Sequence, residues 1–261
     1  MRRPNSGRFE ARRVGLAAAK GDFVLFLDAR VSIDVGALAF VAANLERGSV
    51  WNGHARIETV GNPYGRFWDV VAAAAFAQYF DDPRTTSFGV DEFDRFPTGT
   101  TCFFAPRRLL DEAFAAFESR YADTRNANDD TPLIRFIAGR ERIWISPEFG
   151  CLYRPRTTLK GFVRHAYHRG IVFLDGHGRR ESSYRHVVRT FYPACLVFAA
   201  AVVWQPLVAP AALVVVVAAA AALAVRKRRP VRDVTAFAAL APVYALGHGA
   251  GMWRALTLSR R

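Results

Sequence analysis

Short apolar runs alternate with amphipathic stretches up to about residue 186, and a nearly continuous apolar region follows. The run FVLFL at 23–27 is typical of the first part, because Gly21 precedes it and Asp28 ends it. Helical and strand periodicities that alternate in this way predict an α/β domain. The change in composition is abrupt, so we predict a soluble domain over residues 1–182 and a membrane domain over residues 183–261.

Turn residues mark the ends of the predicted elements. A helix over 10–20 ends at Gly21, and the strand at 23–27 is apolar on both faces, which favours a central parallel strand. Pro106 opens another helix. The remaining predictions are strands at 54–61 and 98–105, helices at 63–80 and from about 129 to 138, and two short strands at 142–146 and 150–154.

Residues 191–225 contain no charged side chain. A helix rises ~1.5 Å per residue, so this segment is too long for one crossing of a ~30 Å hydrocarbon layer. The tripeptide WQP interrupts it, which predicts a hairpin of two spans over 187–204 and 207–225. A third apolar stretch over 234–253 is rich in glycine. The alternative is a buried hairpin of a soluble protein, but buried helices rarely lack charges over such a length.

Basic residues follow the second predicted span, in the segment RKRRPVR at 226–232. Because cytoplasmic loops carry an excess of Lys and Arg, this segment is placed in the cytoplasm. A hairpin returns to the side from which it starts, so the basic residues at 179–189 and the soluble domain lie there too. We therefore expect a multi-pass protein of the cell membrane with a cytoplasmic soluble domain.

The chain is strongly basic, with a formal net charge of +13. Such an excess is compatible with nucleic acid, or with anionic lipid and phosphate-bearing substrates. Basic groups flank the apolar segment and no nucleic-acid motif is recognised, so we expect a membrane partner and no nucleic acid. The cysteines Cys102, Cys151 and Cys195 are widely spaced without metal-ligand spacing, which predicts reduced, buried thiols.

Two sets of acids stand where ligands bind in α/β domains. Asp28 follows a predicted strand, and ligands of open α/β sheets bind at the carboxyl ends of strands. Asp129 and Asp130 stand at the start of a predicted helix, whose dipole keeps carboxylates ionised. The pattern alone leaves an alternative open, in which Asp28 is a turn or cap residue and the paired acids only begin a helix.

Four segments carry a resemblance to a known family. They are ARRVGLAAAKGDFVLFLDARV at 11–31, TGTTCFFAPRRLLDEA at 98–113, NDDTPLIRFIAGRERIWISPE at 128–148 and YRPRTTLKGFVRHAYHRG at 153–170. In this order they resemble the motifs of the family 2 glycosyltransferases, and in particular the succinoglycan-type membrane polysaccharide synthases. The matching positions are Ala11, Arg12, Gly15, Ala19, Gly21, Asp22, Asp28, Asp129 and Asp130, and His165 stands where that subgroup commonly has Gln.

The resemblance implies a GT-A-like, Rossmann-like mixed sheet followed by C-terminal transmembrane helices. It implies a membrane-bound enzyme that moves a sugar, with inversion, from a nucleotide-diphosphate sugar to a hydroxyl of a lipid-linked or polysaccharide acceptor. Asp130 is then the general base, and Asp129 caps the helix or orients its neighbour. The residues that the resemblance places at the nucleotide sugar are Arg12, Asp28, Arg30, His165 and Arg169.

The sequence departs from the family pattern in two ways. It begins inside the family domain, so we expect a sheet that lacks its first βα units and has an exposed edge. Arg30 replaces the second acid of the Asp-x-Asp motif. The family implies Mg²⁺ or Mn²⁺ bound at Asp28, but Arg30 cannot be a ligand of a hard cation. Three alternatives stay open: Arg30 donates to the diphosphate and partly replaces the metal, a metal is held by Asp28 alone with water, or Arg30 pairs with Asp28 or Asp34.

The segment at 157–173 has apolar residues at helical spacing and basic residues between them. This amphipathic pattern predicts a helix that lies at the bilayer surface and guides a lipid diphosphate, or a packing helix with a solvated basic face. The departures noted above also leave a second function open. In it the chain is a catalytically inactive remnant that acts as a membrane scaffold or binds a partner protein.

Overall fold

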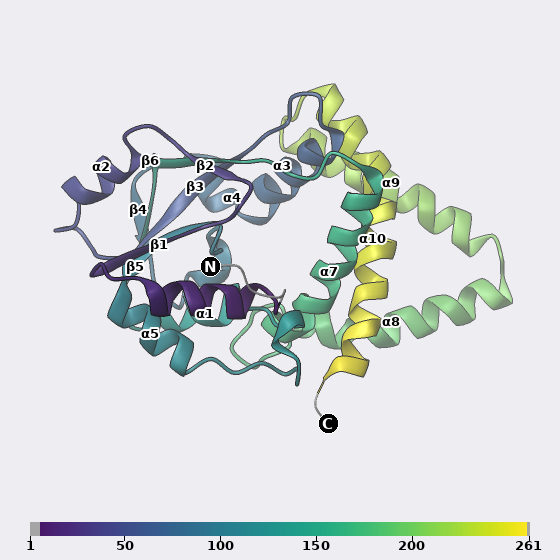
Figure 1. Ribbon diagram of the computed structural model, residues 1–261. Helices are drawn as coiled ribbons and strands as arrows, with labels where there is room; N and C mark the ends of the chain where they lie inside the picture. Colours follow the sequence, from purple (N-terminus) through teal and green to yellow (C-terminus); the bar gives the residue numbers. More distant parts are fainter. Residues whose placement is uncertain (1–5, 260–261) are drawn as a thin grey trace. The chain divides into compact units, whose positions relative to one another are not determined.

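The computed structural model describes residues 6–259 and forms two compact units (Figure 1). One unit comprises residues 6–58 and 75–155, and the other comprises residues 59–74 and 156–259. The elements of the first unit are α1 (Arg8–Ala18), β1 (Phe23–Leu27), β2 (Val31–Ile33), α2 (Ala37–Ala43), β3 (Trp51–Ile57), α4 (Ala77–Phe80), β4 (Thr86–Phe88), η1 (Phe93–Arg95), β5 (Cys102–Pro106), α5 (Arg107–Ala115), η2 (Thr124–Asn126), α6 (Asp130–Ala138) and β6 (Ile143–Tyr153).

The first unit is built on one mixed sheet. Its strands follow the order β1-β5-β3-β6-β2, and β4 pairs with β6 outside this path. The pair β3–β6 is parallel, and the other pairs are antiparallel. The predicted α/β class with a mixed sheet is therefore confirmed.

The prediction that residues 23–27 form a central parallel strand is wrong. β1 lies at an edge of the described sheet and pairs only with β5, in antiparallel register from Phe23↔Pro106 to Leu27↔Cys102. Phe26 faces the core, whereas Phe23 and Leu27 are exposed. An apolar run indicates that a strand lies in apolar surroundings, but it does not indicate which strands pair with it.

The two short strands predicted at 142–146 and 150–154 are one strand, β6. Its parallel partner β3 pairs Gly53 with Ser146 and then His54 with Gly150, so the pairing passes over residues 147–149. A bulge of this kind bends a strand without ending it. The Pro and Gly in this segment, which signalled a break in the sequence, instead mark that irregularity.

Apolar side chains cover both faces of the sheet. One cluster joins α1, α5 and α6 to strand residues such as Phe103 and Ile145, and the second joins α2 to Trp51 and Cys151. The helices α1 and α6 are thereby fixed on the same side of the sheet. This placement matters for the site, because α1 and α6 carry its charged residues.

The second unit is helical. It contains almost all of α3 (Pro63–Ala75), together with α7 (Leu159–His177), α8 (Arg185–Trp204), α9 (Val208–Arg226) and α10 (Val231–Leu258). The helix predicted at 63–80 is divided, because Phe76 leaves helical geometry between α3 and α4. The helices α8, α9 and α10 are each long and apolar enough to cross a membrane. They match the three predicted apolar spans, except that α9 begins one residue after the predicted start at 207, and they indicate membrane association.

Glycines allow α7 and α10 to pack closely. A Cβ atom added at Gly170 would lie 2.0 Å from the carbonyl oxygen of His248, and one at Gly251 would lie 2.0 Å from that of Tyr167. Neither separation is compatible with a side chain. The spacing of Gly247 and Gly251 is the small-xxx-small pattern by which helix backbones approach one another.

Charged residues of the second unit form a network between α3 and the start of α10. Arg66 Nη1 donates to Asp233 Oδ1 at 2.9 Å, and Arg229 pairs with Asp69 and lies 3.9 Å from Asp233. Positive and negative groups thus alternate around Asp233, which is buried. The network fixes the short α9–α10 connection against α3.

Candidate functional site

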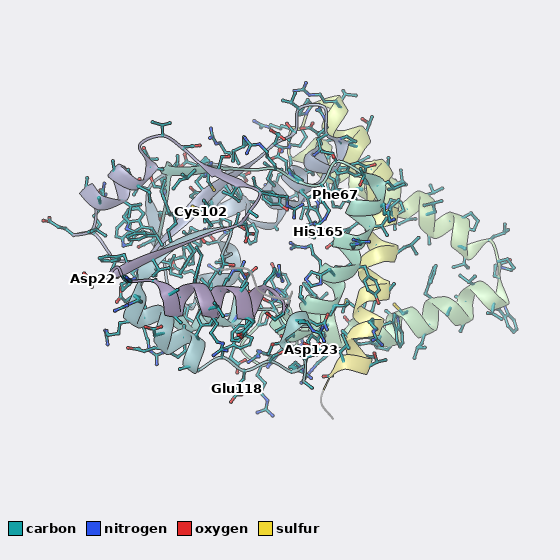
Figure 2. The ribbon with its side chains drawn as sticks, in the orientation of Figure 1. Asp22, Phe67, Cys102, Glu118, Asp123 and His165 are labelled. Carbon is teal, nitrogen blue, oxygen red and sulfur yellow. The ribbon has the colours of Figure 1, made fainter. Side chains whose placement is uncertain are left out.

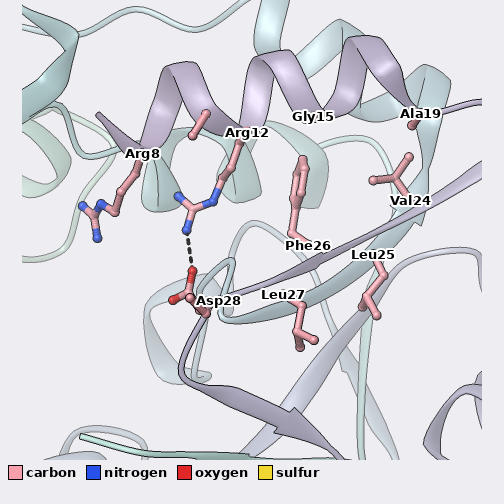
Figure 3. Close-up of a pocket in the computed structure, with 11 residues that line it drawn as sticks. Arg8, Arg12, Gly15, Ala19, Val24, Leu25, Phe26, Leu27 and Asp28 are labelled. Carbon is pink, nitrogen blue, oxygen red and sulfur yellow. Dashed lines mark hydrogen bonds and ion pairs between the residues drawn. The ribbon is translucent and has the colours of Figure 1, made fainter. Parts of the chain in front are cut away.

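The charged cluster at the centre of the candidate site is built around Arg12 on α1. Arg12 Nη2 donates to Asp28 Oδ1 at 3.0 Å, and Nη1 donates to Asp130 Oδ1 at 3.1 Å. Nη1 also contacts Oδ2 of Asp129. One guanidinium thus joins an acid that follows β1 to two acids at the start of α6, and Figure 3 shows its bond to Asp28.

Local structure positions each of these groups. On α1, Arg8 and Arg12 are four residues apart, so they project from the same face of the helix. Asp28 follows β1, and its N–H donates to the carbonyl of Thr101 at 3.0 Å, which extends the β1–β5 pairing by one residue. Asp129 is the N-cap residue of α6, and Asp130 is the first helical residue. The predicted helix start at these acids is confirmed.

Asp129 is the most buried acid of the cluster, since its side chain is 1% exposed. Burial and the nearby charge of Asp130 raise the pKa of Asp129, against the opposite effect of Arg12 and Arg8. Burial alone lowers the pKa of Arg12, but the carboxylates of Asp130, Asp129 and Asp28 outweigh it and raise that pKa. Arg12 is therefore a permanent cation among three acids.

Two contributors to the cluster were missed from the sequence. Arg8 lies 3.5 Å from Asp129 Oδ1, and the hydroxyl of the buried Thr100 contacts Oδ1 of Asp130. The four-residue spacing of Arg8 and Arg12 was a signal that both face one site. The segment TGTT carried no comparable signal, because a hydroxyl before a strand is common in turns.

A pocket of about 510 Å³ adjoins the cluster. Its wall comes from one face of α1 and from β1 with the residues that follow it, and it includes Arg8, Arg12 and Asp28 (Figure 3). Gly15 forms part of the α1 wall, and a Cβ atom added there would meet nothing within 4 Å. The pocket therefore offers two cations and one carboxylate at an open, partly apolar wall.

Arg30 does not belong to the cluster. Its guanidinium lies 5.6 Å from the centre of the Tyr153 ring, and its side chain forms no ion pair within residues 6–259. The alternative in which Arg30 pairs with Asp28 or Asp34 is therefore wrong for the described structure, because those acids pair with Arg12 and Arg56. The proposed contact of Arg30 with a diphosphate stays a prediction.

His165 and Arg169, also predicted at the nucleotide sugar, lie on α7 in the second unit. The ring of His165 is 4.9 Å from that of Trp68, and the Arg169 guanidinium lies 4.9 Å from the Trp68 ring centre. Figure 2 labels His165 and also Phe67, whose ring lies 5.3 Å from that of Trp68. These residues form an aromatic and basic cluster of their own.

The amphipathic helix predicted at 157–173 is α7. Phe162, Ala166 and Gly170 are buried, and Gly170 packs on α10. Lys160 and Arg164 are exposed. The helix thus has a packed apolar face and a solvated basic face. This agrees with the interpretation of the 157–173 segment as a packing helix with a solvated basic face.

The donor set does not fit a divalent cation as it stands. Within residues 6–259 no group of three or more His, Cys, Asp or Glu side chains is arranged to hold a metal ion. Oδ1 of Asp28 is paired with Arg12, and Arg30 occupies the place of the second acid. The expected role of Mg²⁺ or Mn²⁺ at Asp28 stays a prediction.

No protein-family model matches the sequence, and no curated protein matches it significantly.

Proposed function

We propose that this chain is a membrane-bound glycosyltransferase with a GT-A-like domain. It would move a sugar from a nucleotide-diphosphate sugar to a hydroxyl of a lipid-linked or polysaccharide acceptor. The observation that supports the proposal most strongly is the cluster in which Arg12 joins Asp28 to Asp129 and Asp130. Acids about a hundred residues apart in the sequence meet beside a pocket that also presents Arg8 and Arg12.

The chemistry assigns one role to each charged group. A diphosphate leaving group gains negative charge as the bond to the sugar breaks, and the guanidiniums of Arg8 and Arg12 stabilise that charge. Asp130 accepts the proton of the acceptor hydroxyl, whose oxygen forms the new bond to the anomeric carbon. The side chain of Asp130 is 32% exposed, so an acceptor reaches it. Asp129, buried behind it, holds Arg12 in place.

The membrane part of the proposal concerns orientation and acceptor. The positive charges at both ends of the α8–α9 hairpin support a multi-pass protein of the cell membrane with its catalytic unit in the cytoplasm. The exposed basic residues Lys160 and Arg164 of α7 suit a lipid diphosphate. The family resemblance implies that His165 and Arg169 also bind the nucleotide sugar.

The test uses the full chain purified in detergent. We expect UDP or GDP to bind in calorimetry, and the matching nucleotide sugar to transfer label to a lipid extract. Asp130→Asn should bind the nucleotide and lose transfer, whereas Asp123→Asn, an exposed acid in a local ion pair, serves as the matched control. If Asp130→Asn transfers sugar as fast as the unmodified chain, Asp130 is not the base.

One observation favours a second candidate, a non-catalytic membrane scaffold. Arg12 already pairs with all three acids, as in a purely structural charge network. A scaffold would bind neither UDP nor GDP in the calorimetric experiment. Repeating the transfer assay with Mg²⁺, with Mn²⁺ and with a chelator also tests the metal that the family resemblance implies.

A further inference from the structure

The two ends of the α8–α9 hairpin contact the same helix, α10, at positions far apart along it. In the first half of α8, Tyr192 Oη donates to the carbonyl of Met252 at 3.2 Å, and its ring lies 5.3 Å from that of Trp253. Phe191 lies 3.5 Å from a Cβ atom added at Gly249. The first end of the hairpin therefore rests on the C-terminal third of α10.

The other end of the hairpin rests on the N-terminal part of α10. The buried residues of α9 are Ala220 and Ala224, both near its C-terminus. A short connection then leads to α10, and within it Arg229 lies 3.9 Å from Asp233. From Asp233 to Met252, α10 advances about 28 Å at ~1.5 Å per residue.

Between these two ends the side chains of the hairpin are exposed or half-buried. No residue from 189 to 219 is buried, and residues 191–225 carry no charge. In Figure 1, α8 and α9 diverge from α10 and meet at their far ends. Both helices are long and apolar enough to cross a bilayer, so the surface that they expose suits lipid.

A hairpin of two membrane-spanning helices begins and ends at the same surface of the bilayer. The line that joins its two ends must therefore lie in the plane of that surface. The axis of α10 runs along this line. Tyr192 of α8 contacts α10 at Met252, and Arg229, which follows α9, lies close to Asp233. α10 is consequently parallel to the membrane surface.

The opposite assumption, that α10 crosses the bilayer, leads to an unfavourable arrangement. The two ends of the hairpin would then lie at opposite surfaces, and α8 and α9 would meet near the middle of the bilayer. The turn at 205–207 would place the polar amide side chain of Gln205 in hydrocarbon, where no water is present to hydrogen-bond it. Arg254, near the end of α10, would lie opposite the basic segment at 226–232.

We propose that α8 and α9 alone cross the membrane, and that α10 lies along the membrane surface on the side of the 226–232 segment. α7 packs against one face of α10 through Gly170 and Gly251, and Leu246, Trp253 and Leu256 on α10 are exposed. An interfacial helix buries such residues at the headgroup boundary. The charges at 185–189, 226–232 and Arg254 then share one surface. This topology holds whether or not the chain transfers sugar.

The test labels single cysteines in the full chain in cells, with a maleimide that cannot cross membranes. The positions are Gln205→Cys at the hairpin tip, Arg226→Cys at its end and Ser259→Cys after α10. The unsubstituted chain is the control, because Cys102 and Cys151 are buried and Cys195 lies in α8. We expect Ser259→Cys to label from the same side as Arg226→Cys, and Gln205→Cys from the other side.

Labelling of Ser259→Cys from the same side as Gln205→Cys would overturn the proposal, because α10 would then cross the bilayer. Alkaline phosphatase fused after Gln205 and after Ser259 provides a second measurement, since this enzyme is active only when exported. We expect activity in the first fusion and none in the second. Activity in both fusions would equally overturn the proposal.

Discussion

Arg12 donates a hydrogen bond of 3.0 Å from Nη2 to Oδ1 of Asp28, and this bond joins the first helix to the end of the first strand. The same guanidinium holds the two acids at the start of α6. Since α1 and α6 cover the same side of the sheet, one cation fixes three elements around the pocket. The stability of the first unit and the shape of its pocket therefore depend on the same residue.

Replacement of Arg12 by Gln should destabilise the first unit strongly. Asp129 is 1% exposed, and loss of Arg12 leaves its buried carboxylate with the more distant and half-exposed cation of Arg8. Breaking a buried ion pair in this way costs about 3–5 kcal/mol. Thermal unfolding of the purified chain measures the effect. Arg13→Gln is the matched control, because Arg13 is exposed and, within residues 6–259, pairs only with Glu10. Equal melting temperatures for the two variants would refute this role of Arg12.

The raised pKa of Asp129 predicts how stability depends on pH. A carboxyl whose pKa is higher in the folded state than its ordinary value of 3.8 binds its proton more readily when folded. Its contribution is therefore fully present below pH 3.8 and is lost as the pH rises through the folded-state pKa. Asp129→Asn removes this titration, so the variant should gain stability relative to the unmodified chain as the pH rises from acid.

Denaturant unfolding at a series of acid pH values gives the comparison. Asp123→Asn is again the control, because its contacts with Arg125 lower the pKa of Asp123 and reverse the expected slope. A constant difference in unfolding free energy between Asp129→Asn and the unmodified chain would contradict the prediction.

Arg8 offers a way to separate binding from stability. It lines the pocket and its side chain is 48% exposed, so its ion pair with Asp129 contributes little to folding. Under the proposed function, Arg8→Gln should weaken UDP or GDP binding in calorimetry, with a melting temperature close to that of the unmodified chain. Unchanged affinity would remove Arg8 from the diphosphate site.

The sequence predicted the elements that local signals define. The length of the uncharged segment at 191–225 predicted two membrane-length helices, and the tripeptide WQP located the turn between α8 and α9. The start of α6 at Asp129 and Asp130 followed from the preference of acids for helix N-termini. Asp28 and the paired acids were placed in one site through the order of motifs, and in the structure they share Arg12.

The sequence did not predict which strands pair or which residues distant in the sequence come into contact. β1 pairs with β5 because of register and of the helices that cover the sheet, and an apolar run at 23–27 carries no information on that choice. β6 continues through residues 147–149, over which its pairing with Gly53 and His54 of β3 shifts in register. Thr100 was not predicted at the site, because no local pattern distinguishes it. It contacts Asp130 of α6 through the long-range arrangement of β5 and α6.

The contact between α7 and α10 provides a last prediction, because two glycines of α10 differ only in their surroundings. A Cβ atom at Gly251 would lie 2.0 Å from the carbonyl oxygen of Tyr167, whereas the nearest atom to one at Gly249 would lie at 3.5 Å. Gly251→Ala should therefore separate the helices and cost about 1–3 kcal/mol, as overpacking typically does. Gly249→Ala should be neutral or stabilising by up to about 1 kcal/mol, since Ala favours helix more than Gly.

Thermal unfolding in detergent, with both variants measured beside the unmodified chain, distinguishes the two cases. A lowered melting temperature for Gly251→Ala alone indicates that α10 is held against α7 by close backbone contact. Equal behaviour of the two variants would mean that the contact of Gly251 with α7 does not support the fold. α10 could then leave α7 at little cost, and its position along the membrane surface would rest only on the two ends of the α8–α9 hairpin.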